Sequence, residues 1–299
     1  MKSPFGVMLT AMITPFAPDG SQDLDGAQKL ATHLVDTLGH DGLVINGTTG
    51  EASTKSDAED LSLLLAVVEA VGDRATIIAG VGTNDTAHSI SSAKAAVKAG
   101  VHALMAAAPY YNRPPQQGIF EHFWAIADNT DLPLMTYDIP RRTGVAIDTE
   151  TLVRLAEHPR IIANKDAKGD LEASQWVMAR TDLAWYSGED SLNLALLALG
   201  AGGMVSVVGH LVGDRLAKMA DVFWSGDVEA ARGINASLLP VYTGIFRTQG
   251  VILTKAALNL QGLPSGPVRL PLVNATPSEI EQLKIDLAAG GVAPFASCA

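Results

Sequence analysis

The chain has 299 residues, of which 47% are hydrophobic and 18% are charged. These fractions are typical of a soluble globular protein and exclude a largely disordered chain. The 21 basic and 32 acidic side chains give a formal net charge of −11. This balance argues against a broadly basic surface, so we expect no nucleic-acid partner, although a locally basic pocket for anionic substrates remains compatible with it.

The cysteine content and the apolar segments predict neither an intrachain disulfide nor a membrane span. The only cysteine, Cys298, cannot form a disulfide within the chain, which suits a reducing compartment, and we expect a cytoplasmic protein. Residues 191–213 contain no Asp, Glu, Lys or Arg, and such a stretch is long enough to span a bilayer. Glycines interrupt it at positions 200, 202, 203 and 209, so we predict a buried helix, a turn and a strand, with no membrane association.

Short apolar runs predict eight strands, over residues 7–13, 42–46, 76–80, 103–107, 132–137, 161–165, 184–187 and 204–208. Segments with helical periodicity lie between them, for example 57–71, 86–99 and 192–199. This alternation predicts an α/β protein with a (β/α)8 TIM barrel over residues 1–226. A C-terminal helical extension follows over residues 227–299, with helices expected over 227–238, 240–260 and 277–289.

A lysine interrupts the sixth apolar run, Ile161-Ile-Ala-Asn-Lys-Asp-Ala167. Burying an unpaired ammonium is costly, and desolvation lowers the pKa of a lysine until the amine is neutral and nucleophilic. At the mouth of a barrel strand, Lys165 could then form an imine with a ketone. Alternatively, its side chain extends to solvent beside Asp166, and this segment alone leaves both interpretations open.

Other unusual residues also follow strands, at the barrel end where active sites form. Gly47-Thr48-Thr49-Gly50-Glu51 follows the second strand, and its backbone N–H groups could bind a carboxylate or phosphate. An ordinary turn that binds no ligand could have the same sequence. The fourth strand leads into Pro109-Tyr110-Tyr111-Asn112, and the fifth into Tyr137-Asp-Ile-Pro-Arg-Arg-Thr-Gly144. The ends of the second, fourth, fifth and sixth strands thus bring together a candidate anion-binding turn, tyrosines, an arginine and a lysine. This combination predicts one site.

These three segments, together with Lys165-Asp-Ala-Lys-Gly-Asp-Leu171, resemble in order and spacing the dihydrodipicolinate synthase/N-acetylneuraminate lyase family of class I aldolases. Trp185-Tyr-Ser-Gly-Glu-Asp190 and the glycine-rich run into Ser206 extend the resemblance over nearly the whole chain. Within the family, the chain is most similar to the members that condense pyruvate with L-aspartate 4-semialdehyde. The resemblance therefore implies a Schiff-base lyase that makes 4-hydroxy-tetrahydrodipicolinate in lysine and diaminopimelate biosynthesis.

The resemblance also implies catalytic roles. Lys165 would form an imine with pyruvate, and Tyr137 would act on it as a general acid and base. Thr48 and Tyr111 would connect Tyr137 to solvent through a relay of hydroxyl groups. In the family, the residue matching Tyr111 comes from a neighbouring subunit, so a complete site requires at least a dimer, and we expect a homotetramer built as a dimer of dimers.

Substrate binding is implied by the same resemblance. The backbone N–H groups of Thr48 and Thr49 would hold the pyruvate carboxylate, and the carbonyl of Val205 would contribute nearby. Arg142 would bind the far carboxylate of aspartate semialdehyde, since a guanidinium makes paired, charge-assisted hydrogen bonds with it. The alternative is that Arg142 only pairs with surface acids. Asn164 departs from the family, which usually has an aliphatic residue before the lysine.

Two alternative functions are compatible with parts of this pattern. A related pyruvate-dependent aldolase or lyase for 2-keto-3-deoxy sugar acids would share Lys165 and Tyr137 but would not need Arg142. A catalytically inactive homologue that senses a ligand would not need the lysine, the tyrosine and the threonine turn together. The seven histidines show no paired ligand spacing, so we expect no metal, and the covalent imine requires no cofactor.

Inhibition by lysine, the product of the pathway, is expected to be weak or absent. In inhibited family members, lysine binds at a subunit interface, and the matching positions here are Ala52, Ser53, Asp57, Asn84, His88 and Tyr110. Sensitive members often carry a glutamate where this chain has His88. An imidazole cannot supply the same attraction for the ammonium group of the ligand.

Overall fold

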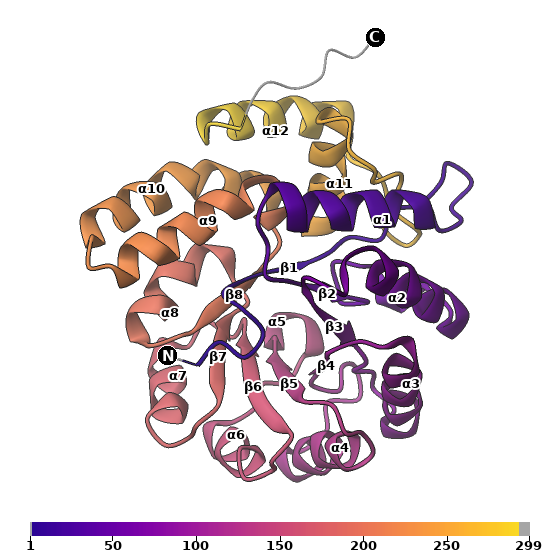
Figure 1. Cartoon of the computed structure of the whole chain (residues 1–299), viewed down its shortest axis with the longest axis vertical. Coiled ribbons are helices and arrows are strands. Elements are labelled where there is room, and N and C mark those ends of the chain that lie inside the picture. The colour runs from indigo at the N-terminus through magenta and orange to yellow at the C-terminus, as the bar shows by residue number, and fades with distance from the viewer. Residues whose placement is uncertain (1, 293–299) are drawn as a thin grey trace.

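The computed structural model describes residues 2–292, and Cys298 lies outside this range. Eight parallel strands form a closed barrel in chain order, with β8 paired to β1, and helices surround the barrel (Figure 1). The predicted (β/α)8 fold is confirmed. The strands are β1 (Met8–Ala11), β2 (Gly42–Ile45), β3 (Thr76–Gly80), β4 (Ala103–Ala107), β5 (Leu134–Asp138), β6 (Ile161–Asp166), β7 (Ala184–Ser187) and β8 (Gly203–Ser206).

The helices of the barrel follow the strands in alternation, and α2 and α3 have the predicted bounds. A capping box at Ser56 and Glu59 begins α2. The helical elements up to residue 224 are α1 (Leu24–Thr32), η1 (His33–Thr37), η2 (Ala52–Thr54), α2 (Asp57–Val71), α3 (Thr86–Ala99), α4 (Gln116–Asp128), α5 (Pro140–Thr143), α6 (Thr149–Leu155), α7 (Leu171–Met178), η3 (Asp190–Leu192), α8 (Asn193–Leu199) and α9 (Gly209–Trp224).

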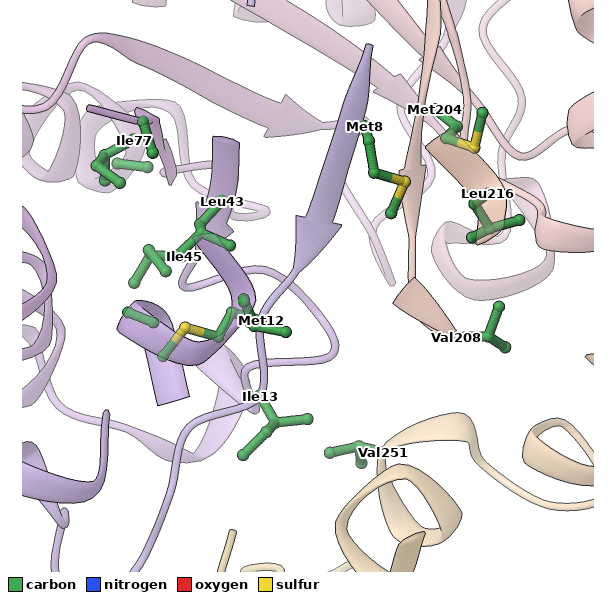
Figure 2. Close-up of a cluster of buried hydrophobic side chains, with 14 of the residues drawn as sticks. Met8, Met12, Ile13, Leu43, Ile45, Ile77, Met204, Val208, Leu216 and Val251 are labelled. Atoms are coloured by element: carbon green, nitrogen blue, oxygen red, sulfur yellow. The ribbon is translucent and has the colours of Figure 1, made fainter. Parts of the chain in front are cut away.

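Each strand is buried on both faces, so alternate residues belong to different cores. In β2, Val44 belongs to the cluster inside the barrel, whereas Leu43 and Ile45 pack outward under the helices (Figure 2). The inner cluster includes Leu9, Met105 and Tyr186, so the barrel is filled by side chains and is not a pore. Polar side chains that are found inside the barrel therefore stand out.

Three helices follow the barrel: α10 (Val228–Ile245), α11 (Gly250–Leu260) and α12 (Pro277–Ala289). In Figure 1 they lie together beside α9 and α1. The side chain of Val251 on α11 points toward Ile13, which follows β1 (Figure 2). Because this region packs directly on the barrel, its treatment as a separate region over 227–299 remains our proposal.

The expected break before Pro240 is wrong. Helix α10 continues through Pro240 to Ile245, and the break falls over residues 246–249 instead. A proline inside a helix removes one backbone hydrogen bond. Here the buried side chains of Leu238, Val241 and Tyr242 belong to the main hydrophobic core on both sides of the proline, and this packing outweighs the loss.

Residues 191–213 form η3, α8, β8 and the start of α9, as predicted. Within residues 2–292, no helix has the length and apolar character that crossing a membrane requires.

Candidate active site

Lys165 lies on β6 with its side chain inside the barrel. The amine nitrogen is 4.1 Å from the centroid of the Tyr137 ring, and the residue is only 4% exposed. Asn164 points to the opposite face, where its side-chain oxygen accepts a hydrogen bond of 2.8 Å from the Thr136 hydroxyl. The unusual Asn164 therefore lies away from the amine, outside the barrel.

Burial lowers the pKa of Lys165 from its ordinary value of 10.5 to about 7. The negative charges of Asp190 and Glu189 act in the opposite direction, while the positive charge of Arg142 lowers the pKa further. A substantial fraction of the amine is therefore neutral at neutral pH. A neutral amine in a polar barrel mouth is a nucleophile for carbonyl groups.

Two residues lie next to Lys165, one on each side of β6. Tyr137 is on β5, and Gly188 follows the end of β7. Tyr137 of β5 is paired in register with Lys165, and burial raises the pKa of its phenol. Gly188 comes directly after β7, and a Cβ atom there would lie 2.9 Å from both Cγ and Cε of Lys165. Only glycine leaves room for the lysine side chain at this point.

A group of charged residues surrounds the amine. Arg141, on the short helix α5, forms an ion pair with Glu189, whose side chain is only 19% exposed. Arg142 is exposed, and its charge acts on both Tyr137 and Lys165. The structure therefore leaves one arginine at the barrel mouth engaged with a protein carboxylate, while the other is available to a ligand.

The turn after β2 presents two backbone amides. The N–H groups of Gly50 and Glu51 donate to the carbonyls of Gly47 and Thr48, at 3.0 and 3.1 Å. In the described part of the chain, the N–H groups of Thr48 and Thr49 donate to no protein acceptor, and both residues are at least partly exposed. Adjacent free amides of this kind are suited to an anionic ligand.

Tyr111 does not reach Tyr137 within one chain. It lies in the loop after β4, is 89% exposed and has a left-handed backbone with φ 69°. Among residues 2–292, no hydrogen bond joins the Tyr137 hydroxyl to Thr48 or Tyr111. The proposed hydroxyl relay is therefore not assembled by a single chain.

Val205 lies in β8, 1% exposed, and belongs to the inner cluster with Tyr137. Asp190 fixes the backbone that follows it: its carboxylate accepts the Ser206 hydroxyl and the N–H groups of Val207 and Val208, both at 3.0 Å. No site role was predicted for Gly188, Glu189 or Asp190. Their signals in the sequence were their place directly after a strand and the resemblance of the segment 185–190 to the family.

Within the described residues, no three His, Cys, Asp or Glu side chains are grouped so that they could hold a metal ion. The expectation of a metal-free site remains a prediction.

Residues 4–289 match the model of the Dihydrodipicolinate synthetase family. The chain belongs to this family. It is 65% identical over 291 residues, 97% of each chain, to 4-hydroxy-tetrahydrodipicolinate synthase 2 of Streptomyces coelicolor. Among solved structures, it is similar to lysine-bound DHDPS from Cyanidioschyzon merolae, with a TM-score of 0.95, 41% identity and coverage of 98% and 100% of the two chains. It is also similar to the chloride-inhibited dihydrodipicolinate synthase from Acinetobacter baumannii complexed with pyruvate, with a TM-score of 0.93, 34% identity and coverage of 97% and 100%.

Proposed function

We propose that this enzyme condenses pyruvate with L-aspartate 4-semialdehyde to 4-hydroxy-tetrahydrodipicolinate in lysine and diaminopimelate biosynthesis. The observation that carries the proposal is the buried Lys165 beside Tyr137, with the pKa of the lysine lowered to about 7. The similarity of the chain to 4-hydroxy-tetrahydrodipicolinate synthase 2 of Streptomyces coelicolor supports the choice of reaction. The exposed Arg142 at the barrel mouth favours this substrate over a sugar-derived aldehyde, because the semialdehyde brings a carboxylate in addition to that of pyruvate.

The reaction begins when the neutral amine of Lys165 attacks the ketone carbon of pyruvate. Loss of water gives a protonated imine, and loss of a methyl proton then gives an enamine. The enamine carbon attacks the aldehyde, and Tyr137 protonates the resulting alkoxide. The amino group of the semialdehyde finally attacks the imine carbon, which closes the ring and releases Lys165. One water molecule is produced, and no redox step occurs.

The geometry of the barrel mouth supports the proposed binding roles. The free N–H groups of Thr48 and Thr49 hold the pyruvate carboxylate, Arg142 holds the carboxylate of the aldehyde, and the Val205 carbonyl contributes beside the imine. Thr48 and Tyr111 complete a proton relay to Tyr137, with Tyr111 supplied by a neighbouring chain. The covalent imine replaces any cofactor. We further propose a cytoplasmic homotetramer, built as a dimer of dimers.

Borohydride reduction in the presence of pyruvate tests the proposal, because it makes the imine permanent. We expect one pyruvate-derived adduct per chain, on Lys165, and no adduct in Lys165→Ala. Steady-state assays should then show turnover with aspartate semialdehyde and little with sugar-derived aldehydes. An unmodified Lys165 peptide in active enzyme would exclude this mechanism, and preferential use of a sugar-derived aldehyde would favour the alternative aldolase.

A further inference from the structure

The turn that presents the Thr48 and Thr49 amides is flanked by two strained residues. Asn46 and Glu51 both have a left-handed backbone, with φ angles of 60° and 54°. Residues that have a Cβ atom adopt this conformation at a cost in conformational free energy, and this cost is smaller for asparagine than for glutamate. Glu51 in particular needs interactions that hold it in place.

Glu51 is anchored by a residue from the C-terminal helices. Its carboxylate lies 2.6 Å from the ammonium of Lys255 on α11, and both side chains are at most 3% exposed. The other carboxylate oxygen accepts a hydrogen bond of 2.8 Å from the backbone N–H of Arg269. Because removing one partner of a buried ion pair leaves an uncompensated charge, this contact constrains the position of Glu51 strongly.

Lys255 is itself held from several sides. Its ammonium donates a hydrogen bond of 2.7 Å to the Pro267 carbonyl and lies 4.2 Å from the centroid of the Phe16 ring. The guanidinium of Arg269 contacts the same ring, also at 4.2 Å from the centroid. The β1–α1 loop, the turn after β2, α11 and the segment after α11 therefore meet at Lys255.

The other end of the turn has a matching anchor. Lys55, whose side chain is fully buried, donates to the Asn46 side-chain oxygen at 2.5 Å and pairs with Asp60 at 2.9 Å. A buried lysine thus restrains each of the two left-handed residues. The active-site machinery described above uses neither lysine.

We propose that Lys255 is a positioning residue for the keto-acid carboxylate: through Glu51, it holds the turn over residues 47–51 so that the Thr48 and Thr49 amides face the ligand. This inference rests on the proposed function. It assigns to the C-terminal helical region a role in substrate binding, because α11 supplies the lysine.

The test measures the pyruvate concentration that gives half-maximal borohydride trapping on Lys165, by intact mass, in the full-length protein. In Lys255→Met, we expect this concentration to rise by about tenfold to a hundredfold, since misplacing a binding group by about an ångström has effects of that size. The yield at saturating pyruvate should stay at one adduct per chain, because Lys165 is unchanged.

Arg247→Met is the matched control. It breaks the ion pair between Arg247 and Asp286, with distances of 2.6 and 2.9 Å, in the same helical region but away from the turn. We expect a lower melting temperature and an unchanged half-saturating pyruvate concentration. A shift as large as that of Lys255→Met would mean that general destabilisation causes the effect, and would overturn the inference.

If Lys255→Met does not fold, Glu51→Gln tests whether the ion pair positions the turn. This substitution keeps the shape of the Glu51 side chain and removes its charge. We expect a rise in the half-saturating pyruvate concentration in the same direction. A folded variant of either kind with the wild-type value overturns the role of Lys255. Failure of the wild-type protein to form any adduct would instead overturn the proposed function.

Discussion

Burial destabilises the charged form of Lys165 and makes its amine reactive. At 4% exposure, the charged form is poorly solvated, and the pKa falls from 10.5 to about 7. The amine is protonated below that pKa and neutral above it. Imine formation should therefore rise with pH, with a midpoint near 7, and level off at higher pH. Trapping with cyanoborohydride at saturating pyruvate would measure this profile, and a midpoint near the ordinary lysine pKa would contradict the assigned environment.

The two neighbouring arginines offer a matched comparison. Arg141 is paired with Glu189, whereas in the described part of the chain Arg142 forms no ion pair. Arg142→Ala should weaken use of aspartate semialdehyde by ~1.5–3 kcal/mol, the range for a hydrogen bond to a charged group. Pyruvate trapping on Lys165 should persist. The measurement is kcat/KM for the aldehyde, with Arg141→Ala as the control with a smaller loss.

Wild-type kinetics in Arg142→Ala would weaken the aspartate semialdehyde assignment. They would strengthen the sugar-acid alternative, which has no need of this guanidinium.

His88 leads to a prediction about feedback. Its Nε2 lies 2.9 Å from the Asp57 carboxylate, so this carboxylate already has a partner within the chain. We therefore expect millimolar lysine to leave most of the activity intact. His88→Glu should increase sensitivity, because a charged hydrogen bond to the lysine ammonium contributes ~1.5–3 kcal/mol. Initial rates titrated with lysine would measure both proteins, and half-inhibition of the wild type well below a millimolar would refute this interpretation.

At the scale of elements, the sequence predicted the order and number of the strands, because each apolar run corresponds to one strand. The strand ends differ by up to two residues; β5, for example, begins at Leu134 and includes Asp138. Strands buried on both faces lack an alternating pattern, so the sequence did not reveal that Asn164 points outward. The continuation of α10 through Pro240 depends on tertiary packing, which local rules do not contain.

Asp190 binds the backbone of the β8–α9 turn, and its negative charge also raises the pKa of Lys165. One oxygen of its carboxylate accepts the N–H groups of Val207 and Val208, and the other accepts the Ser206 hydroxyl. Asn at this position has a single side-chain oxygen and cannot accept both sets of hydrogen bonds. Asp190→Asn should destabilise the fold by about 1–3 kcal/mol, the cost of an unsatisfied buried group. The lost negative charge should also move the midpoint of imine formation to lower pH, since Asp190 favours the charged form of Lys165.

Urea unfolding and the trapping profile would measure the two effects of Asp190→Asn separately. Asp182→Asn, which removes an exposed ion pair with Lys2, is the control and should change neither quantity appreciably. An unchanged trapping midpoint in Asp190→Asn would show that the carboxylate only supports the turn.

At the scale of the whole molecule, the candidate site combines segments that are distant in sequence. The motifs at strand ends predicted Lys165, Tyr137 and the threonine turn. The contact between Glu51 and Lys255 could not be predicted in this way, because the lysine lies in a helix outside the barrel. A helical lysine with no nearby motif is indistinguishable in sequence from an ordinary surface charge.

The exposed Tyr111 extends the same argument to the assembly. If Tyr111 completes the site of a neighbouring chain, Tyr111→Ala and Lys165→Ala should each be nearly inactive, yet a mixed dimer should hold one intact site. After subunit exchange of an equal mixture, we expect about a quarter of wild-type activity, because half of the dimers are mixed and each has one working site of two. Activity assays with sedimentation analysis would measure this. No recovery in mixed dimers would show that Tyr111 does not act across the interface, since a role within its own chain leaves every site with one defect.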